Sequence, residues 1–250
     1  MPLTILLNIL FSVVLFPSFM AEKSQLPTAV TNIIFHWEDD FSNSEKKKVR
    51  TWLNATSNAT FKLLGNYPFE LHFHLYRASN ANEPVPWANT IRSDKQGVNF
   101  YINPDFSLGD FLHDWTAPHE ISHLAIPAVG PENSWFSEGF ASFMQGEILV
   151  EMNELSQKEI DDKYQEKRNM AQLYFESKKP FTKVASRLKS DHLYAALYWG
   201  GAGFFAKLDE HLLKTKGIKL ADMLKSYQNC CRLSDKDLED VVSSFDKISG

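Results

Sequence analysis

Two histidines and a glutamate stand at a spacing that suits zinc chemistry. The segment His119-Glu120-Ile121-Ser122-His123 places its two histidines four residues apart. On a helix, side chains at i and i+4 project from one face, one turn apart, so both imidazoles can reach one metal ion. Glu120 can then approach a water at that ion and accept its proton. Because Pro118 suits a first helical turn, the segment predicts a zinc site near a helix start.

A catalytic zinc ion needs a third protein ligand and an open position for water. Glu138 fits best, since the 14 residues between it and His123 can turn the chain into an antiparallel helix. The metzincin pattern is excluded, because its required Gly and His positions hold Ile126 and Val129. Glu132 is the weaker rival, because it falls in the turn itself.

Two further motifs follow the first in order. The segment Trp135-Phe-Ser-Glu-Gly-Phe-Ala141 surrounds Glu138, and Tyr198 stands 60 positions beyond that glutamate, followed by Trp199 and Gly200. Together with the His119–His123 segment, they resemble the gluzincin metallopeptidases, specifically the aminopeptidase N and glycyl-aminopeptidase group. The resemblance covers roughly residues 97–209.

The resemblance implies a thermolysin-like catalytic fold that binds Zn²⁺ and hydrolyses peptide bonds in a peptide or protein substrate. It implies His119, His123 and Glu138 as zinc ligands and Glu120 as the general base. It implies Tyr198 as the hydroxyl that stabilises the oxyanion, as a preorganised O–H donor can. Tyr194, one helical turn earlier, is the rival for that role.

The aminopeptidase strand motif Gly-Ala-Met-Glu-Asn, whose Glu grips a free amine, is absent. The comparable stretch 92–97 reads Arg-Ser-Asp-Lys-Gln-Gly, and its Asp94 is interpreted as part of a solvated turn. The sequence therefore favours a metallopeptidase but does not support exopeptidase specificity, and the choice between an endopeptidase and an aminopeptidase stays open. Two alternatives remain: a zinc-binding protein of the same fold that binds peptides without cleaving them, and an accidental motif in a helical interaction domain.

The surrounding pattern predicts the α+β class, with one domain at 22–250 made of a sheet-containing lobe (22–106) and a helical lobe (107–250). Alternation predicts strands at 29–37, 69–76 and 97–103, and a Pro/Asn-rich loop at 80–89. His72 and His74 share one face of the second strand and are interpreted as polar-face residues. Helices are predicted at 44–64, 108–115, 117–125, 134–155, 157–177, 191–213, 220–227 and 235–248.

Residues 1–21 lack charged side chains and contain a short apolar run, which predicts a signal peptide and a secreted or periplasmic protein. The alternative is an uncleaved membrane anchor. The net charge of −5 over 250 residues gives no electrostatic footprint for nucleic acid. Cys230 and Cys231 are adjacent, and because a bridge between neighbours needs unusual geometry, a pair of thiols is expected. The alternative is a bridge between two chains in an oxidising compartment.

Overall fold

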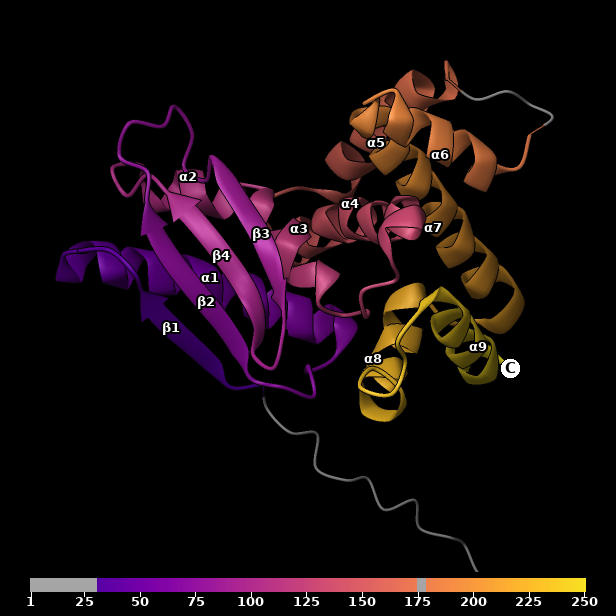
Figure 1. The fold of residues 1–250 in the computed structure, drawn as a ribbon, viewed down its shortest axis with the longest axis horizontal. Helices are drawn as coiled ribbons and strands as arrows, with labels where there is room; N and C mark the ends of the chain where they lie inside the picture. Colours follow the sequence, from indigo (N-terminus) through magenta and orange to yellow (C-terminus); the bar gives the residue numbers. More distant parts are fainter. Residues whose placement is uncertain (1–30, 175–178) are drawn as a thin grey trace, which may run out of the picture.

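The structure is a computed structural model that describes residues 31–174 and 179–250. The predicted signal peptide at 1–21 lies outside these residues. Among the helices within them, none is long and apolar enough to cross a membrane. The predicted α+β class is confirmed, because a mixed four-stranded sheet is followed by a mostly helical half (Figure 1).

The sheet has the order β1-β2-β4-β3. Strands β1 (Ile33–Trp37), β2 (Leu71–Arg77) and β4 (Gln96–Ile102) are parallel, and β3 (Trp87–Arg92) pairs with β4 in the antiparallel sense. Strands β1 and β3 are therefore the two edges.

One face of the sheet packs on helix α1 (Asn43–Leu64), which starts with a capping box between Ser42 and Glu45. Trp52 of this helix contacts the rings of Phe100 and Phe111, and all three are fully buried. In Figure 1 helix α1 lies behind the sheet, and the face toward the viewer carries no labelled helix. The alternation in β2 therefore sends Leu71, Phe73 and Leu75 to the core and the two histidines, with Tyr76, to the other face.

The helical half wraps around a central pair, α4 (Ser134–Glu151) and α7 (Tyr194–Lys216), with α3 (Thr116–His123) packed against α4. Gly139 of α4 meets Gly201 of α7 so closely that a Cβ on Gly201 would lie 2.8 Å from the Gly139 Cα. The helices are α2 (Leu108–His113), α3 (Thr116–His123), α4 (Ser134–Glu151), α5 (Gln157–Gln172), α6 (Phe181–Ser190), α7 (Tyr194–Lys216), α8 (Leu220–Cys230) and α9 (Leu238–Ser249), with a 3₁₀ turn at Pro131–Asn133.

Two elements differ from the sequence prediction. The predicted loop at 80–89 overlaps strand β3, which begins at Trp87; its pairing with β4 supplies hydrogen bonds that local composition does not reveal. Helix α6 was not predicted, although Val184, Ala185 and Leu188 form a buried face after Pro180. Prolines near both segments favoured a loop in the sequence prediction, whereas contacts with other parts of the chain stabilise a strand and a helix there.

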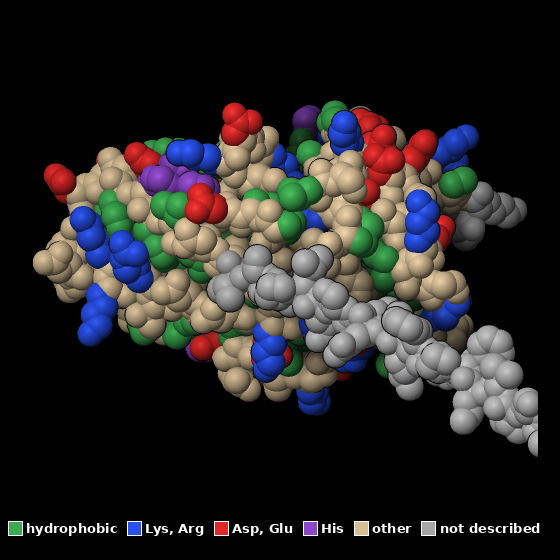
Figure 2. Space-filling view, turned by 90° about the horizontal axis from the view of Figure 1, so that it is seen from below, with side chains coloured by type: hydrophobic (Ala, Val, Ile, Leu, Met, Phe, Trp, Pro, Cys, Tyr) green, Lys and Arg blue, Asp and Glu red, His purple; other side chains and the backbone are tan. Residues whose placement is uncertain are grey.

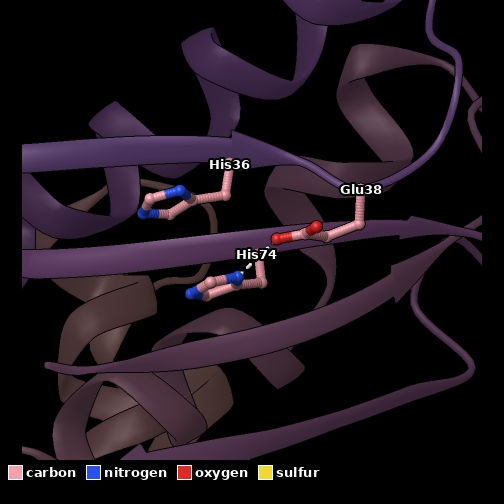
Figure 3. Close-up of side chains that lie close together, drawn as sticks. All are labelled: His36, Glu38 and His74. Carbon is pink, nitrogen blue, oxygen red and sulfur yellow. Dashed lines mark hydrogen bonds and ion pairs between the residues drawn. The ribbon is translucent and has the colours of Figure 1, made fainter.

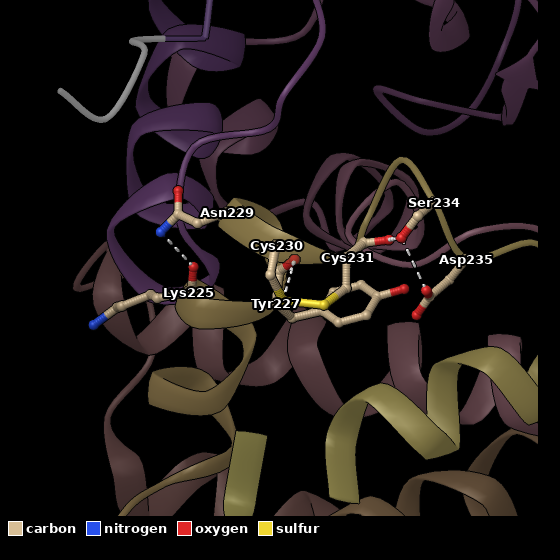
Figure 4. Close-up of a disulfide and its surroundings, with 7 residues drawn as sticks. All are labelled: Lys225, Tyr227, Asn229, Cys230, Cys231, Ser234 and Asp235. Atoms are coloured by element: carbon tan, nitrogen blue, oxygen red, sulfur yellow. Dashed lines mark hydrogen bonds between the residues drawn. A yellow bond between two sulfur atoms is a disulfide. The ribbon is translucent and has the colours of Figure 1, made fainter. Parts of the chain in front are cut away.

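The expectation of free thiols is wrong, because Cys230 and Cys231 form a disulfide (Figure 4). Helix α8 ends at Cys230, and Cys231 leaves the helical backbone with φ −130° and ψ −25°. Because the backbone is no longer helical at Cys231, the two neighbouring side chains can reach each other, which they could not do within a continuous helix.

Candidate active site

Helix α3 presents both motif histidines inward. His119 and His123 are each only about 5% exposed, and their Nε2 atoms lie 3.2 Å apart. Pro118 occupies the first turn of this helix, as expected, and removes an N–H that would have had no helical partner. The two imidazoles therefore converge on one point in the interior.

Glu138, on helix α4, completes this group. Its Oε2 lies 3.3 Å from the His119 Nε2 and 3.5 Å from the His123 Nε2. Zinc bonds of about 2.0–2.1 Å in tetrahedral geometry place donors about 3.3–3.4 Å apart. The three donor atoms thus form a triangle of the size that zinc requires, so the residues fit the ion.

The outer nitrogens of both rings have partners that fix this arrangement. The His119 Nδ1 lies 3.0 Å from the Gln145 Oε1, and the His123 Nδ1 lies 3.2 Å from the Ser137 Oγ. Because an amide oxygen only accepts, His119 donates from Nδ1, and in the neutral ring this leaves the Nε2 lone pair available to a metal ion at the point where the three donors meet. Such outer partners orient metal-binding histidines and raise their basicity.

The charge balance of the group calls for a cation. Burial lowers the pKa of His119, but hydrogen bonding to Glu138 and the charges of Glu120 and Glu138 outweigh burial, so the pKa is raised. Burial likewise opposes ionisation of Glu138, yet the two facing imidazoles hold the pKa of its carboxyl well below the usual range. The pocket favours positive charge where the three donors meet.

Glu120 and Tyr198 line the same cleft, which has a volume of about 400 Å³. The Tyr198 ring is centred 6.4 Å from the His119 ring. Burial, together with the negative charges of Glu138 and Glu120, raises the pKa of Tyr198 to about 12. The phenol therefore keeps its proton at neutral pH and can donate a hydrogen bond into the cleft.

The rival residues lie elsewhere. Tyr194 is 45% exposed, and its hydroxyl lies 3.0 Å from the His192 Nδ1. Glu132 is exposed in the 3₁₀ turn, where its carboxylate accepts a hydrogen bond from the Asn133 side chain. Neither lines the cleft, and nor does Asp94, which is exposed in the turn between β3 and β4.

Residues distant in sequence hold the carboxyl end of α3, and the motif search did not reveal them. The Arg92 guanidinium donates to the carbonyl oxygens of His123 at 2.6 Å and Ile126 at 2.7 Å. The buried Tyr67 hydroxyl donates to the carbonyl oxygen of Ile121 at 2.7 Å. Burial and the nearby Arg232 lower the pKa of Arg92 to about 10, so it stays charged at neutral pH and suits a helix carboxyl end.

The C-terminal region adds two more donors to the same helix end. The Arg232 Nε donates to the carbonyl oxygen of Leu124 at 2.8 Å, and the Gln228 side chain donates to that of Ala125 at 2.9 Å. The disulfide of Cys230 and Cys231 lies between these two residues in the chain. Helix α8 and its end thus help to fix the motif helix.

A second group of possible ligands was missed. His36, Glu38 and His74 lie together on the sheet (Figure 3). The sequence placed His74 on a polar strand face but did not connect it to His36, because strand pairing decides that contact. An unusual density of histidine on two predicted strands was the only available signal.

Comparison with known proteins does not identify a family for this chain. No family model matches the chain, and no curated protein matches its sequence. The assignment of chemistry to these residues therefore rests on their distances and surroundings.

Proposed function

We propose that this chain is a zinc-dependent peptidase with a thermolysin-like site. The observation that supports this most directly is the triangle of 3.2, 3.3 and 3.5 Å formed by the donor atoms of His119, His123 and Glu138. Two neutral imidazoles and one carboxylate leave a zinc site with net positive charge and a free coordination position. That donor set is typical of hydrolytic zinc sites.

The chain's own residues supply the remaining chemistry. A bound zinc ion provides Lewis acidity, which polarises a carbonyl and lowers the pKa of water toward about 7. Glu120, beside the ligands in the cleft, accepts the proton of the attacking water and passes it to the leaving amine. Tyr198 remains protonated and donates to the oxygen on which negative charge develops.

The shape of the cleft favours a peptide as substrate. Residues Trp87 to Thr90 of the edge strand β3 line it, and β3 has a hydrogen-bonded neighbour on one side only. An extended peptide can add to such an edge through its main chain. The exposed Trp87 and Trp115 flank the same cleft and offer apolar area to side chains.

The test uses the purified full chain, loaded with zinc and incubated with a peptide library whose products are mapped by mass spectrometry. Glu120→Gln should lower kcat/KM by about 100-fold to 10,000-fold, because general acid–base catalysis contributes that much, while zinc content stays unchanged. Glu132→Gln, which changes an exposed carboxylate in the turn, is the matched control and should leave kcat/KM as it is.

Each outcome separates one alternative. Activity retained in Glu120→Gln would overturn the proposed mechanism. Stoichiometric zinc without cleavage of any library peptide would favour a peptide-binding protein instead. Cleavage only at free N-termini would restore the aminopeptidase interpretation. The leader at 1–21 adds export as a second proposal, which N-terminal sequencing of the chain recovered outside the cytoplasm would test.

A further inference from the structure

Three histidines gather on the face of the sheet opposite α1. His36 of β1 stands in register with His74 of β2, and His72 lies two residues earlier on the same face of β2. Figure 1 shows no labelled helix over this face, and Figure 2 shows histidine side chains grouped at the surface beside acidic and basic ones. Packing against a described helix therefore does not explain them.

His36, His74 and Glu38 can approach a common ion. The His74 Nδ1 lies 2.6 Å from the Glu38 Oε1, and the rings of His36 and His74 stack with centroids 4.3 Å apart. One donor atom from each residue lies within 4.8 Å of those of the other two. Figure 3 shows the Glu38 carboxylate directed at the pair of parallel rings.

His72 contacts this group through a hydrogen bond with His36. Its Nδ1 lies 2.8 Å from the His36 Nε2, and the side chain is only 4% exposed. In the tautomer in which the His36 Nε2–H donates a hydrogen bond to the His72 Nδ1, the His36 Nδ1 carries a lone pair that can bind a metal. A second partner that fixes the tautomer of a ligand is what metal-binding histidines ordinarily have.

We propose that His36, Glu38 and His74 form a second divalent-cation site that takes Zn²⁺. Imidazole and carboxylate donors suit an ion of this borderline character, and exposure of the site lets water complete the coordination. The donors must draw together to about 3.3 Å, and the two stacked rings must turn so that both lone pairs meet at the ion; both histidines are half-buried and Glu38 is exposed, so this rearrangement involves side chains at the surface of the sheet. Bound there, the ion joins the edge strand β1 to β2 and acts structurally, apart from the cleft.

The test separates the two sites by disabling one at a time. In the full chain carrying His119→Ala and His123→Ala, calorimetric titration with Zn²⁺ should still find one ion per chain, and zinc should raise the Tm. Adding His36→Ala and His74→Ala should abolish both effects. Because no activity is measured, failure here leaves the proposed peptidase open to its own test.

Controls address folding and adventitious binding. Glu38→Gln keeps the strand residues in place and should weaken zinc binding at least tenfold, as loss of a charged ligand requires. His113→Ala, which removes an exposed histidine that contacts Glu154 and the Gly109 carbonyl oxygen, should leave the stoichiometry at one. Circular dichroism of the metal-free variants checks the sheet. No zinc binding in the first variant, or the same binding after loss of His36 and His74, would overturn the proposal.

Discussion

His119, His123 and Glu138, called the motif site below, and His36, Glu38 and His74, called the sheet cluster, offer the same donors from two different scaffolds. Each group has two imidazoles and one carboxylate. The motif donors come from packed helices and lie 3.2–3.5 Å apart. The sheet donors come from neighbouring strands at an exposed edge and lie within 4.8 Å of one another. Only the first group already has the spacing that zinc imposes.

The difference teaches how a scaffold prepares a metal site. In the interior, each ring has an outer partner and the helix end is held by Arg92 and Arg232, so little remains to be ordered when the ion binds. At the sheet, His74 and Glu38 must give up a direct hydrogen bond and rearrange. We therefore expect tighter binding at the motif site, since ordering side chains costs free energy.

The largest expected effect comes from removing a motif ligand. Glu138→Gln keeps the shape of the side chain but removes the charge that both imidazoles face, so zinc affinity at this site should fall by about 100-fold or more, beyond the loss of an outer partner. Competition with a chelator measures the change. The sheet cluster should keep its affinity; an equal loss at both sites would contradict their independence.

Removing the hydrogen-bond partner of a ligand histidine should lower zinc affinity by a similar factor at either site. Gln145→Leu leaves the His119 Nδ1 without its acceptor, and His72→Leu leaves the His36 Nε2 without its partner. Each change should lower the zinc affinity of its own site by about 10-fold to 100-fold. Titration of each variant, with the other site disabled, measures the effects. A change that crosses from one site to the other would break the comparison.

Sequence alone predicted the motif site far better than the sheet cluster, for a physical reason. His119 and His123 are neighbours through helix periodicity, which is local, and Glu138 follows after one turn of the chain. His36 and His74 meet because two parallel strands pair in one register. Strand β3, which begins at Trp87, and the hydrogen bonds of Arg92 were not predicted for the same reason. Both depend on partners that are distant in sequence.

Close packing behind the motif site should cost stability when it is disturbed. A Cβ at Gly201 would overlap the Trp135 carbonyl oxygen and crowd Gly139, the residue after Glu138. Gly201→Ala should lower the free energy of unfolding by about 1–3 kcal/mol, the usual cost of overpacking. Gly203→Ala on the same helix meets only Arg168 at ordinary contact distance and should be neutral or mildly stabilising.

Urea denaturation of both variants, with zinc titration of each, separates packing from metal binding. Gly201→Ala should also weaken the motif site, because helix α4 carries Glu138. Equal stabilities for the two alanine variants would show that the helices separate without cost, and would remove close packing as the reason for the difference between the two clusters.

The smallest expected effect concerns the segment that leads into the motif helix. Burial raises the pKa of Asp114 to about 6, although the Thr116 N–H hydrogen bond opposes this. The folded chain then binds this proton more tightly than the unfolded chain, so stability should fall as pH rises from about 4 to about 6. After allowance for partial exposure, the loss should be about 1 kcal/mol.

Asp114→Asn keeps an acceptor for Thr116 but cannot ionise, so its urea stability should be flatter between pH 4 and pH 6 than that of the unaltered chain. The measured quantity is the difference between the two chains rather than either curve alone. Parallel curves would show that Asp114 is as well solvated in the folded chain as in the unfolded one. The start of the motif helix would then be as open to water as the sheet cluster, and the contrast between a buried and an exposed scaffold would begin only at His119.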